Sequence, residues 1–393
     1  MLERQLPSKL PGVGTTIFTE MSAMAHAHGA LNMSQGFPDF QPPTALQQAV
    51  TRAMADGHNQ YAPMAGNLRL REWIAQEIES RTGTVYDVES EITVGAGASS
   101  LLFATIQALI QRGDEAMVLT PCYDLYEPAV HLAGGTVVSV PLKADSHHLD
   151  MEAIAQAWTS RTKLIIVNVP NNPSGAIWSR ADLTALAHFL KKKQAFLVSD
   201  EVYGPMVYDG QKQLSAADEP ELVERSAIAV SFGKVLHCTG WKIGYVAAPS
   251  SMTAELRKVH QFDVFSTGAP LQAGIDAFLR SPEGNDHMHE LAAFYVAKRD
   301  RFLKGLEGSK WAFTPAEGGY FQLLCYDRFD DRNDREVTRD WCQQKDGIAL
   351  IPLSPFFPTG SHQSSSSYVR VCFAKGNDTL DRGVERLLRI SNE

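Results

Sequence analysis

The middle of the chain alternates short, uniformly apolar runs with longer segments in which apolar residues recur every three or four positions. The apolar runs predict strands at 92–94, 116–119, 136–140, 164–169, 195–198 and 227–230. The intervening segments predict helices, among them 101–109, 151–158 and 181–192. Strands without a polar face, separated by helices, indicate an α/β fold with a mostly parallel sheet that is covered by helices on both sides.

The pattern differs towards the two ends of the chain. Amphipathic helices are predicted at 18–27, 44–53 and 68–81, and Thr44 is expected to cap the second of them. Beyond about residue 270, helical patterns (286–306, 335–344, 379–389) mix with strand-like stretches (317–323, 348–351, 369–373). We therefore expect an N-terminal arm that contributes to a small domain (1–43), a large domain (44–280) and a small C-terminal α+β domain (281–393). A run of serines within 360–367 predicts a flexible surface loop.

Composition excludes several classes of function. The 393-residue chain is 44% hydrophobic and carries a formal net charge of −9, so it lacks the basic surface that nucleic-acid binding requires. Its five cysteines show no paired spacing typical of a zinc site or a disulfide framework. No apolar window is long enough to span a membrane, and the N-terminal residues show no signal-peptide pattern. We expect a soluble, cytoplasmic protein that binds neither nucleic acid nor membrane.

Chemically versatile side chains follow several of the predicted strands. In open α/β sheets, ligands bind in the crevice beyond the carboxyl ends of the strands. The segments found there are Gly95–Ser99, Pro121–Tyr123, Pro170–Pro173, Ser199–Tyr203, and Ser231 with Lys234. The pattern therefore predicts that an aromatic ring, an amide, a carboxylate, a phenol, an amine and a glycine-rich turn face one crevice.

Lys234 follows the strand 227–230 closely, in a turn beside Gly233, and a second cation, Lys242, comes eight residues later. A desolvated lysine near another cation has a lowered pKa, and its neutral amine can form an imine with a carbonyl compound. A solvated loop lysine is the alternative interpretation.

The stretch from Gly95 to Ser100 lies between a predicted strand and a predicted helix. It lacks the third glycine of the dinucleotide-binding fingerprint. Backbone N–H groups at a helix N-terminus nevertheless form a good phosphate site. A plain turn between a strand and a helix is the alternative.

Three further residues have two interpretations each. Asp200, with Tyr203 one helical turn later, is either a helix N-cap or the partner of a buried cation. Asn172 is either a ligand-binding amide or a turn former. Arg370, on an apolar strand without a neighbouring carboxylate, is expected to bind a ligand carboxylate through its planar guanidinium. For Arg370 the alternative is a salt bridge on an edge strand.

Together, the lysine, aspartate, tyrosine, asparagine, glycine-rich turn and arginine resemble the fold-type-I, pyridoxal-phosphate-dependent aminotransferases of class I/II. The resemblance extends from Ser34–Phe40 to Phe373 and is most specific in the segment 231–245. Gly14–Phe18, Asn59–Pro63 and the Gly233-Lys234 pair resemble the kynurenine/glutamine transaminase branch and, within it, the bacterial methionine aminotransferases. The resemblance implies a seven-stranded sheet in the large domain and a homodimer with active sites shared between subunits.

The resemblance also implies how pyridoxal 5′-phosphate would be held. Lys234 would bind it as a Schiff base and move the proton, while Asp200 would keep the ring nitrogen protonated. Tyr203 and Asn172 would contact the phenolic oxygen, and Tyr123 would stack on the ring. The phosphate contacts would be Ala98, Ser99, Ser231, Lys242 and, from the neighbouring subunit, Tyr61. No metal site is expected.

The substrate would bind through its carboxylate to Arg370, Gly36 and Asn172, with Phe18 and Tyr61 near its side chain. The expected activity is ping-pong transfer of the amino group of an L-amino acid to a 2-oxo acid. Apolar and aromatic residues without an obvious second arginine favour methionine first and aromatic amino acids next, with glutamine, histidine and kynurenine as further candidates. The runner-up is a cysteine-S-conjugate β-lyase or a kynurenine/aromatic aminotransferase on the same fold. A non-catalytic binding protein and a dinucleotide-dependent dehydrogenase are weaker alternatives.

Overall fold

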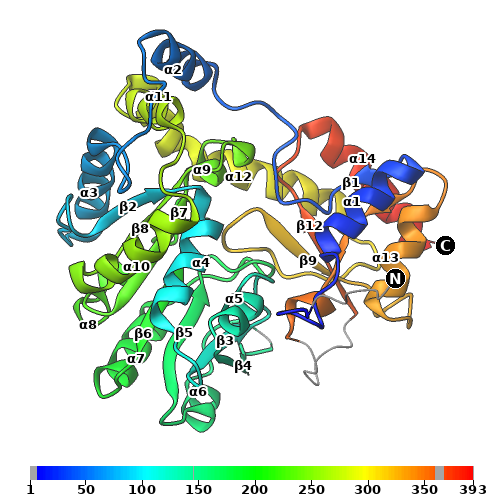
Figure 1. Ribbon diagram of the computed structural model, residues 1–393. Coiled ribbons are helices and arrows are strands. Elements are labelled where there is room, and N and C mark those ends of the chain that lie inside the picture. Colours follow the sequence, from blue (N-terminus) through cyan, green and yellow to red (C-terminus); the bar gives the residue numbers. More distant parts are fainter. Residues whose placement is uncertain (1–6, 145, 359–366, 393) are drawn as a thin grey trace, which may run out of the picture.

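The computed structural model describes residues 7–144, 146–358 and 367–392, which form two lobes with separate sheets (Figure 1). Apart from Ser367, the predicted serine-rich loop lies outside these described residues. The first lobe holds a large sheet and most of the helices, and the second holds two small sheets together with both ends of the described chain.

In the described part of the chain, the large sheet has seven strands. Their spatial order is β2 (Ile92–Gly95), β8 (Gly244–Ala247), β7 (Ser226–Ser231), β6 (Phe196–Asp200), β5 (Thr162–Asn168), β3 (Glu115–Thr120) and β4 (Thr136–Pro141). Strands β7, β6, β5, β3 and β4 pair in parallel, and β8 is antiparallel to both of its neighbours. The mostly parallel α/β sheet and the six predicted strands are therefore confirmed. The pattern did not locate β8, which has only four residues and follows an irregular segment.

Helices cover this sheet because its inner strands are apolar on both faces; every residue of β3, for example, is buried. The helix α4 (Gly97–Leu109) contacts β2, β6, β7 and β8. The other helices of this lobe are α2 (Thr44–Ala55), α3 (Leu68–Thr82), α5 (Tyr126–Leu132), α6 (Met151–Ala157), α7 (Arg180–Lys191), α8 (Pro220–Val223), α9 (Phe232–Val235), α10 (Ser250–Asp263) and α11 (Ala269–Leu279). Burial of their apolar faces against the sheet, and for some helices against one another, as in the packing of α2 on α11, is the main source of stability here.

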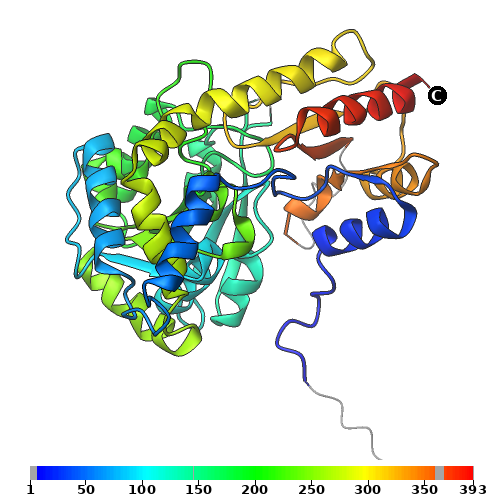
Figure 2. The same cartoon turned by 90° about the horizontal axis from the view of Figure 1, so that it is seen from above.

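The second lobe contains a three-stranded antiparallel sheet in the order β11 (Ile351–Pro352), β12 (Tyr368–Cys372), β9 (Phe321–Cys325). A parallel pair, β1 (Leu31–Asn32) with β10 (Ile348–Ala349), ties the N-terminal segment to it. Around these lie α1 (Ile17–His28), α13 (Asp334–Gln343) and α14 (Asn377–Asn392). The long helix α12 (Pro282–Leu306) runs from the first lobe to the second, where it packs against α14 (Figure 2). The domain limits at 43/44 and 280/281 remain predictions.

Three local predictions are wrong. Thr44 does not cap α2, because Pro43 occupies the N-cap position and Thr44 is already helical. The predicted strand 317–323 becomes regular only at Phe321, because Gly319 adopts a positive φ of 72° in a preceding turn. The predicted strand 348–351 is divided at Leu350 between two different sheets.

Candidate active site

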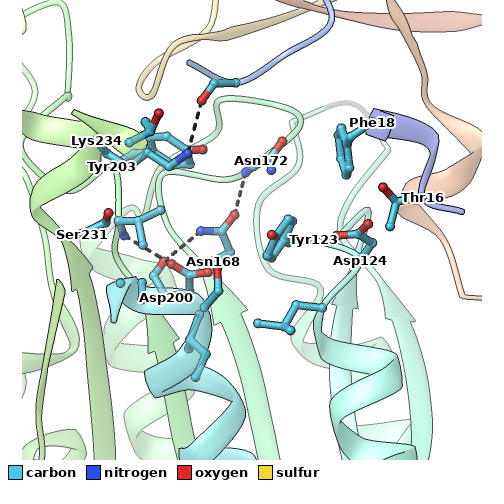
Figure 3. Close-up of a pocket in the computed structure, with 18 of the residues that line it drawn as sticks. Thr16, Phe18, Tyr123, Asp124, Asn168, Asn172, Asp200, Tyr203, Ser231 and Lys234 are labelled. Atoms are coloured by element: carbon cyan, nitrogen blue, oxygen red, sulfur yellow. Dashed lines mark hydrogen bonds between the residues drawn. The ribbon is translucent and has the colours of Figure 1, made fainter. Parts of the chain in front are cut away.

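A cavity of about 590 Å³ opens beyond the carboxyl ends of β5, β6 and β7, and it is closed on the other side by residues of the second lobe (Figure 3). All of the predicted site residues except Tyr61 line it: Phe18, Gly36, Ala98, Ser99, Tyr123, Asn172, Asp200, Tyr203, Ser231, Lys234, Lys242 and Arg370. The structure therefore brings together side chains that are far apart in the sequence.

Tyr61 lies outside this cavity. Its side chain is 85% exposed, and its ring packs edge-on against Phe265 with the ring centroids 5.6 Å apart. The expected contact of Tyr61 was with the site of a neighbouring subunit, so it remains a prediction.

Lys234 lies on the short helix α9, immediately after β7, and its amine points into the cavity (Figure 3). The Nζ atom donates to the carbonyl of Gly36 at 3.3 Å and lies 5.7 Å from the ring centroids of both Tyr203 and Tyr320. Burial lowers the pKa of Lys234 to about 8, and the charges of Lys242 and Arg370 act in the same direction. The solvated-lysine alternative is wrong, and the neutral amine is more accessible near neutral pH than in an exposed lysine.

The glycine-rich turn and Lys242 form the wall of the cavity around the N-terminus of α4. Gly97 has a φ of 76°, and a Cβ atom there would lie 3.3 Å from Cε of Lys242. Lys242 itself has left-handed backbone angles (φ 55°, ψ 50°), which a non-glycine residue adopts only when its surroundings enforce them. Together with Ala98 and Ser231, these residues present N–H groups, a hydroxyl and an ammonium group to the cavity, a combination that suits an anion.

Asp200 is the last residue of β6 and is only 3% exposed. Its Oδ2 atom accepts a hydrogen bond from the hydroxyl of Tyr126 at 2.6 Å, and its Oδ1 atom accepts one from the amide of Val202 at 3.3 Å. Burial raises the pKa of Asp200 to about 6 despite these donors. The residues that follow form tight turns, so the alternative of a helix N-cap is wrong.

Two residues that support Asp200 were not predicted. The Nδ2 atom of Asn168 donates to the backbone carbonyl of Asp200 at 2.9 Å, and its Oδ1 atom accepts from the amide of Asn172 at 2.7 Å (Figure 3). Asn168 ends its strand as Asp200 does, and that position could have revealed it. Tyr126, on α5, gave no comparable signal because its contact with Asp200 spans 74 residues of sequence.

Arg370 is 1% exposed and lies on β12, the central strand of its sheet. Its Nη1 atom donates to Oδ1 of Asn172 at 2.7 Å, its Nη2 atom donates to the carbonyl of Ser34 at 2.8 Å, and its guanidinium lies 3.9 Å from the ring centroid of Phe321. Its Nε atom is buried and has no hydrogen-bond partner among the described residues. The edge-strand salt bridge is therefore wrong: β12 is central, and no carboxylate among the described residues pairs with Arg370.

The loop around Gly36 forms the rim of the cavity and is held from several sides. The carbonyl of Gly36 accepts from Lys234 and also from the hydroxyl of Tyr320 at 2.6 Å. The buried amine of Lys375 donates to the carbonyl of Phe37 at 2.8 Å. Neither Tyr320 nor Lys375 was predicted, because nothing in their local sequence distinguishes them from ordinary strand and loop residues.

Comparison with known proteins identifies the family. Residues 29–387 match the family described as aminotransferase class I and II. The chain belongs to this family. The aminotransferase is 42% identical to the methionine aminotransferase of Escherichia coli K12 over 98% of both chains. It is 32% identical to human kynurenine–oxoglutarate transaminase 3, over 96% of this chain and 88% of that protein.

Solved structures share the fold. The structure of YbdL from E. coli, described as having a methionine aminotransferase function, superposes with a TM-score of 0.93 at 42% identity, over 98% of this chain and 99% of that one. The N-succinyldiaminopimelate aminotransferase of Mycobacterium tuberculosis gives the same TM-score at 34% identity, over 98% and 100% of the two chains. The fold-type-I architecture and the transaminase activity expected from the sequence are thus confirmed. None of the described helices combines the length and apolarity that crossing a membrane would require.

Proposed function

We propose that this aminotransferase uses pyridoxal 5′-phosphate, bound by Lys234, to move the amino group of L-methionine, and less efficiently of aromatic amino acids, to a 2-oxo acid. It acts as a cytoplasmic homodimer by a ping-pong route. The observation that carries the proposal is the convergence of three buried or partly buried charged groups, Lys234, Asp200 and Arg370, in one cavity. Each of these groups is perturbed or unsatisfied in a way that a bound cofactor and substrate would relieve.

The cofactor would supply an aldehyde that reacts with amines and an electron-accepting ring. Asp200 fits the nitrogen of that ring. Its carboxylate is buried and its pKa is raised, so a cation placed against it would stabilise the ionised form. The N–H groups at the start of α4, with Ser231 and Lys242, fit the phosphate, while Tyr123 offers an aromatic face between the two ends of the cavity (Figure 3).

Lys234 fits both the covalent and the acid–base role. Its neutral form is the nucleophile that attacks a carbonyl carbon, and its lowered pKa makes that form accessible near neutral pH. Once released from the cofactor, the same Nζ atom would take the proton from the substrate α-carbon and deliver it to a carbon of the cofactor. It would act as a general base whose pKa is close to the operating pH. Tyr203 and Asn172 would orient the reacting groups beside it.

Arg370 fits the substrate α-carboxylate. Two of its three nitrogens are already held by Asn172 and Ser34, so the guanidinium plane is fixed before a ligand arrives. The Nε atom, which has no acceptor among the described residues, is the donor that a carboxylate would satisfy. Gly36 would add its backbone N–H from the rim of the cavity.

The preference for methionine is supported by the lining beyond this carboxylate site. Phe18, Leu102, Leu125 and Pro128 line the cavity, and such apolar side chains suit an unbranched, polarizable thioether or an aromatic ring. Similarity to the E. coli methionine aminotransferase points the same way. The exposed Tyr61 would reach the site of a second copy, which is why we propose a dimer.

Reduction with borohydride, followed by peptide mapping, tests the cofactor assignment directly. We expect a single tag on the peptide containing Lys234, and a tag on another lysine would refute the assignment. A panel of amino acids, assayed by the first half-reaction with purified holoenzyme, tests the substrate. We expect methionine to exceed aspartate by at least about tenfold in kcat/KM; the reverse order would refute the substrate assignment.

A further inference from the structure

A third carboxylate, Asp124, lines the cavity at the end opposite to Lys234. It follows Tyr123 in the loop after β3. In Figure 3 its carboxylate lies beside Tyr123 and next to Thr16, on the same side as Phe18, whereas Lys234, Asp200 and Ser231 lie across the cavity. Asp124 therefore faces the space left for a substrate side chain once the reacting carbon is placed at Lys234.

No side chain in the described part of the chain pairs with the carboxylate of Asp124. Among the described residues, no hydrogen bond or ion pair joins it to another residue, in contrast to Asp200, which Tyr126 and Val202 hold. The backbone N–H of Asp124 itself donates to the carboxylate, and the charge of Arg370 compensates it in part, although the Nη atoms of Arg370 are already engaged by Asn172 and Ser34. The half-buried carboxylate therefore presents to the cavity a negative charge that Arg370 offsets only in part.

We propose that Asp124 determines side-chain specificity by rejecting amino acids whose side chains end in a carboxylate. Neutral side chains are accepted, and those that end in an N–H donor gain a hydrogen bond to Asp124. The inference rests on the proposed function and narrows its substrate class. It requires only that the substrate α-carboxylate binds Arg370 and that the reacting carbon lies at Lys234, because the remaining space is then bordered by Phe18, Thr16 and Asp124.

The N-terminus of α1 would attract an anion, whereas Asp124 repels one. Thr16 is the N-cap of this helix, so the partial positive charge at the start of α1 lies at the same end of the cavity. That charge amounts to about half an elementary charge and would attract an anion. Once the substrate α-carboxylate has engaged Arg370, the negative charge of Asp124 exceeds this partial charge, and a second carboxylate placed there would meet net repulsion.

Paired inhibitors of equal size give the sharpest test. Glutarate and its monoamide, glutaramate, both carry one carboxylate for Arg370 and differ only in the charge of the other end. Inhibition constants against methionine turnover would be measured for the wild type, for Asp124→Asn, and for Asp124→Glu as the control that keeps the charge. We expect the wild type to favour glutaramate, the preference to fall at least about tenfold in Asp124→Asn, and Asp124→Glu to retain it.

An unchanged preference in Asp124→Asn would overturn the inference, as would a wild type that favours glutarate. Asp124→Ser serves as a second neutral variant if Asp124→Asn does not fold, and it should give the same loss of preference. A wild type that does not turn over methionine or bind the cofactor would instead refute the proposed function, and this inference with it. The two failures are therefore distinguishable.

Discussion

Replacing Tyr126 by phenylalanine isolates the support given to Asp200. The substitution removes one hydroxyl, which donates to Oδ2 of the buried carboxylate at 2.6 Å. A hydrogen bond to a charged group is worth about 1.5–3 kcal/mol, and 1.36 kcal/mol corresponds to one pKa unit. Because the lost donor stabilised the ionised form, the substitution should raise the pKa of Asp200 from about 6 to between about 7 and 8.

This change predicts a specific effect on activity. With its pKa near 6, Asp200 is mostly ionised at pH 7.5 in the wild type, whereas in Tyr126→Phe about half of the molecules would carry a protonated carboxyl. A cation bound beside Asp200 would lower both pKa values but preserve their order. The acidic limb of the pH profile should therefore move to higher pH, and the cofactor should dissociate more readily near neutrality.

The measurement is kcat/KM for the amino donor between about pH 5.5 and 9, together with cofactor retention after dialysis. Tyr295→Phe is the matched control, because the hydroxyl of Tyr295 is equally buried but finds no hydrogen-bond partner in the described part of the chain. That variant should leave the acidic limb in place. If Tyr126→Phe also left it in place, the hydrogen bond would not control the ionisation of Asp200, and our explanation of this carboxylate would be refuted.

Three other substitutions test the rest of the site. Lys234→Ala should abolish the borohydride-stable attachment of the cofactor. In the wild type, the rate at which the cofactor attaches to the apoprotein should rise with pH and level off above about pH 8, because the neutral amine accumulates. A rate that does not depend on pH would contradict this explanation. Arg370→Lys should raise KM for methionine at least about tenfold, because a lysine cannot reproduce the planar fork, while cofactor retention stays constant. If substrate binding and cofactor retention weakened equally, Arg370 would have a structural role instead. Lys375→Met should lower the free energy of unfolding by about 1–3 kcal/mol, because it leaves the carbonyl of Phe37 without its donor. It should also raise KM more than it lowers kcat. A selective loss of kcat would argue that Lys375 does not position the loop around Gly36.

The sequence predicted well what depends on local pattern. Uniformly apolar runs identified six strands of the large sheet, because strands buried on both faces leave no room for polar residues. The rule that ligands bind beyond the carboxyl ends of parallel strands then selected Asp200, Asn172 and Lys234, and all three line the cavity. The roles given to these residues came from the resemblance to a family rather than from their spacing.

The sequence predicted poorly what depends on contacts between distant segments. The support of Asp200 by Tyr126 and of Gly36 by Tyr320 joins residues 74 and 284 positions apart, and no periodicity reports such pairs. Asp124 escaped notice for a different reason. Its neighbour Tyr123 was the more conspicuous residue, and an acidic side chain in a loop is normally solvated.

In this site, buried charged groups whose hydrogen bonds are all made within the protein have structural roles, and those with an unused donor or acceptor have functional roles. Lys375 and Arg370 are both nearly inaccessible cations on or just after β12. The amine of Lys375 donates to the carbonyls of Phe37 and, at 3.5 Å, of Gln35, so it fixes the loop and has little left to offer a ligand. Arg370 keeps one buried donor that no described residue accepts from, and a buried donor without an acceptor costs about 1–3 kcal/mol unless a ligand satisfies it. By the same reasoning, Asp200, which Tyr126 holds, suits a cation in a fixed position. Asp124, to which no other described residue donates a hydrogen bond, suits the variable end of the substrate.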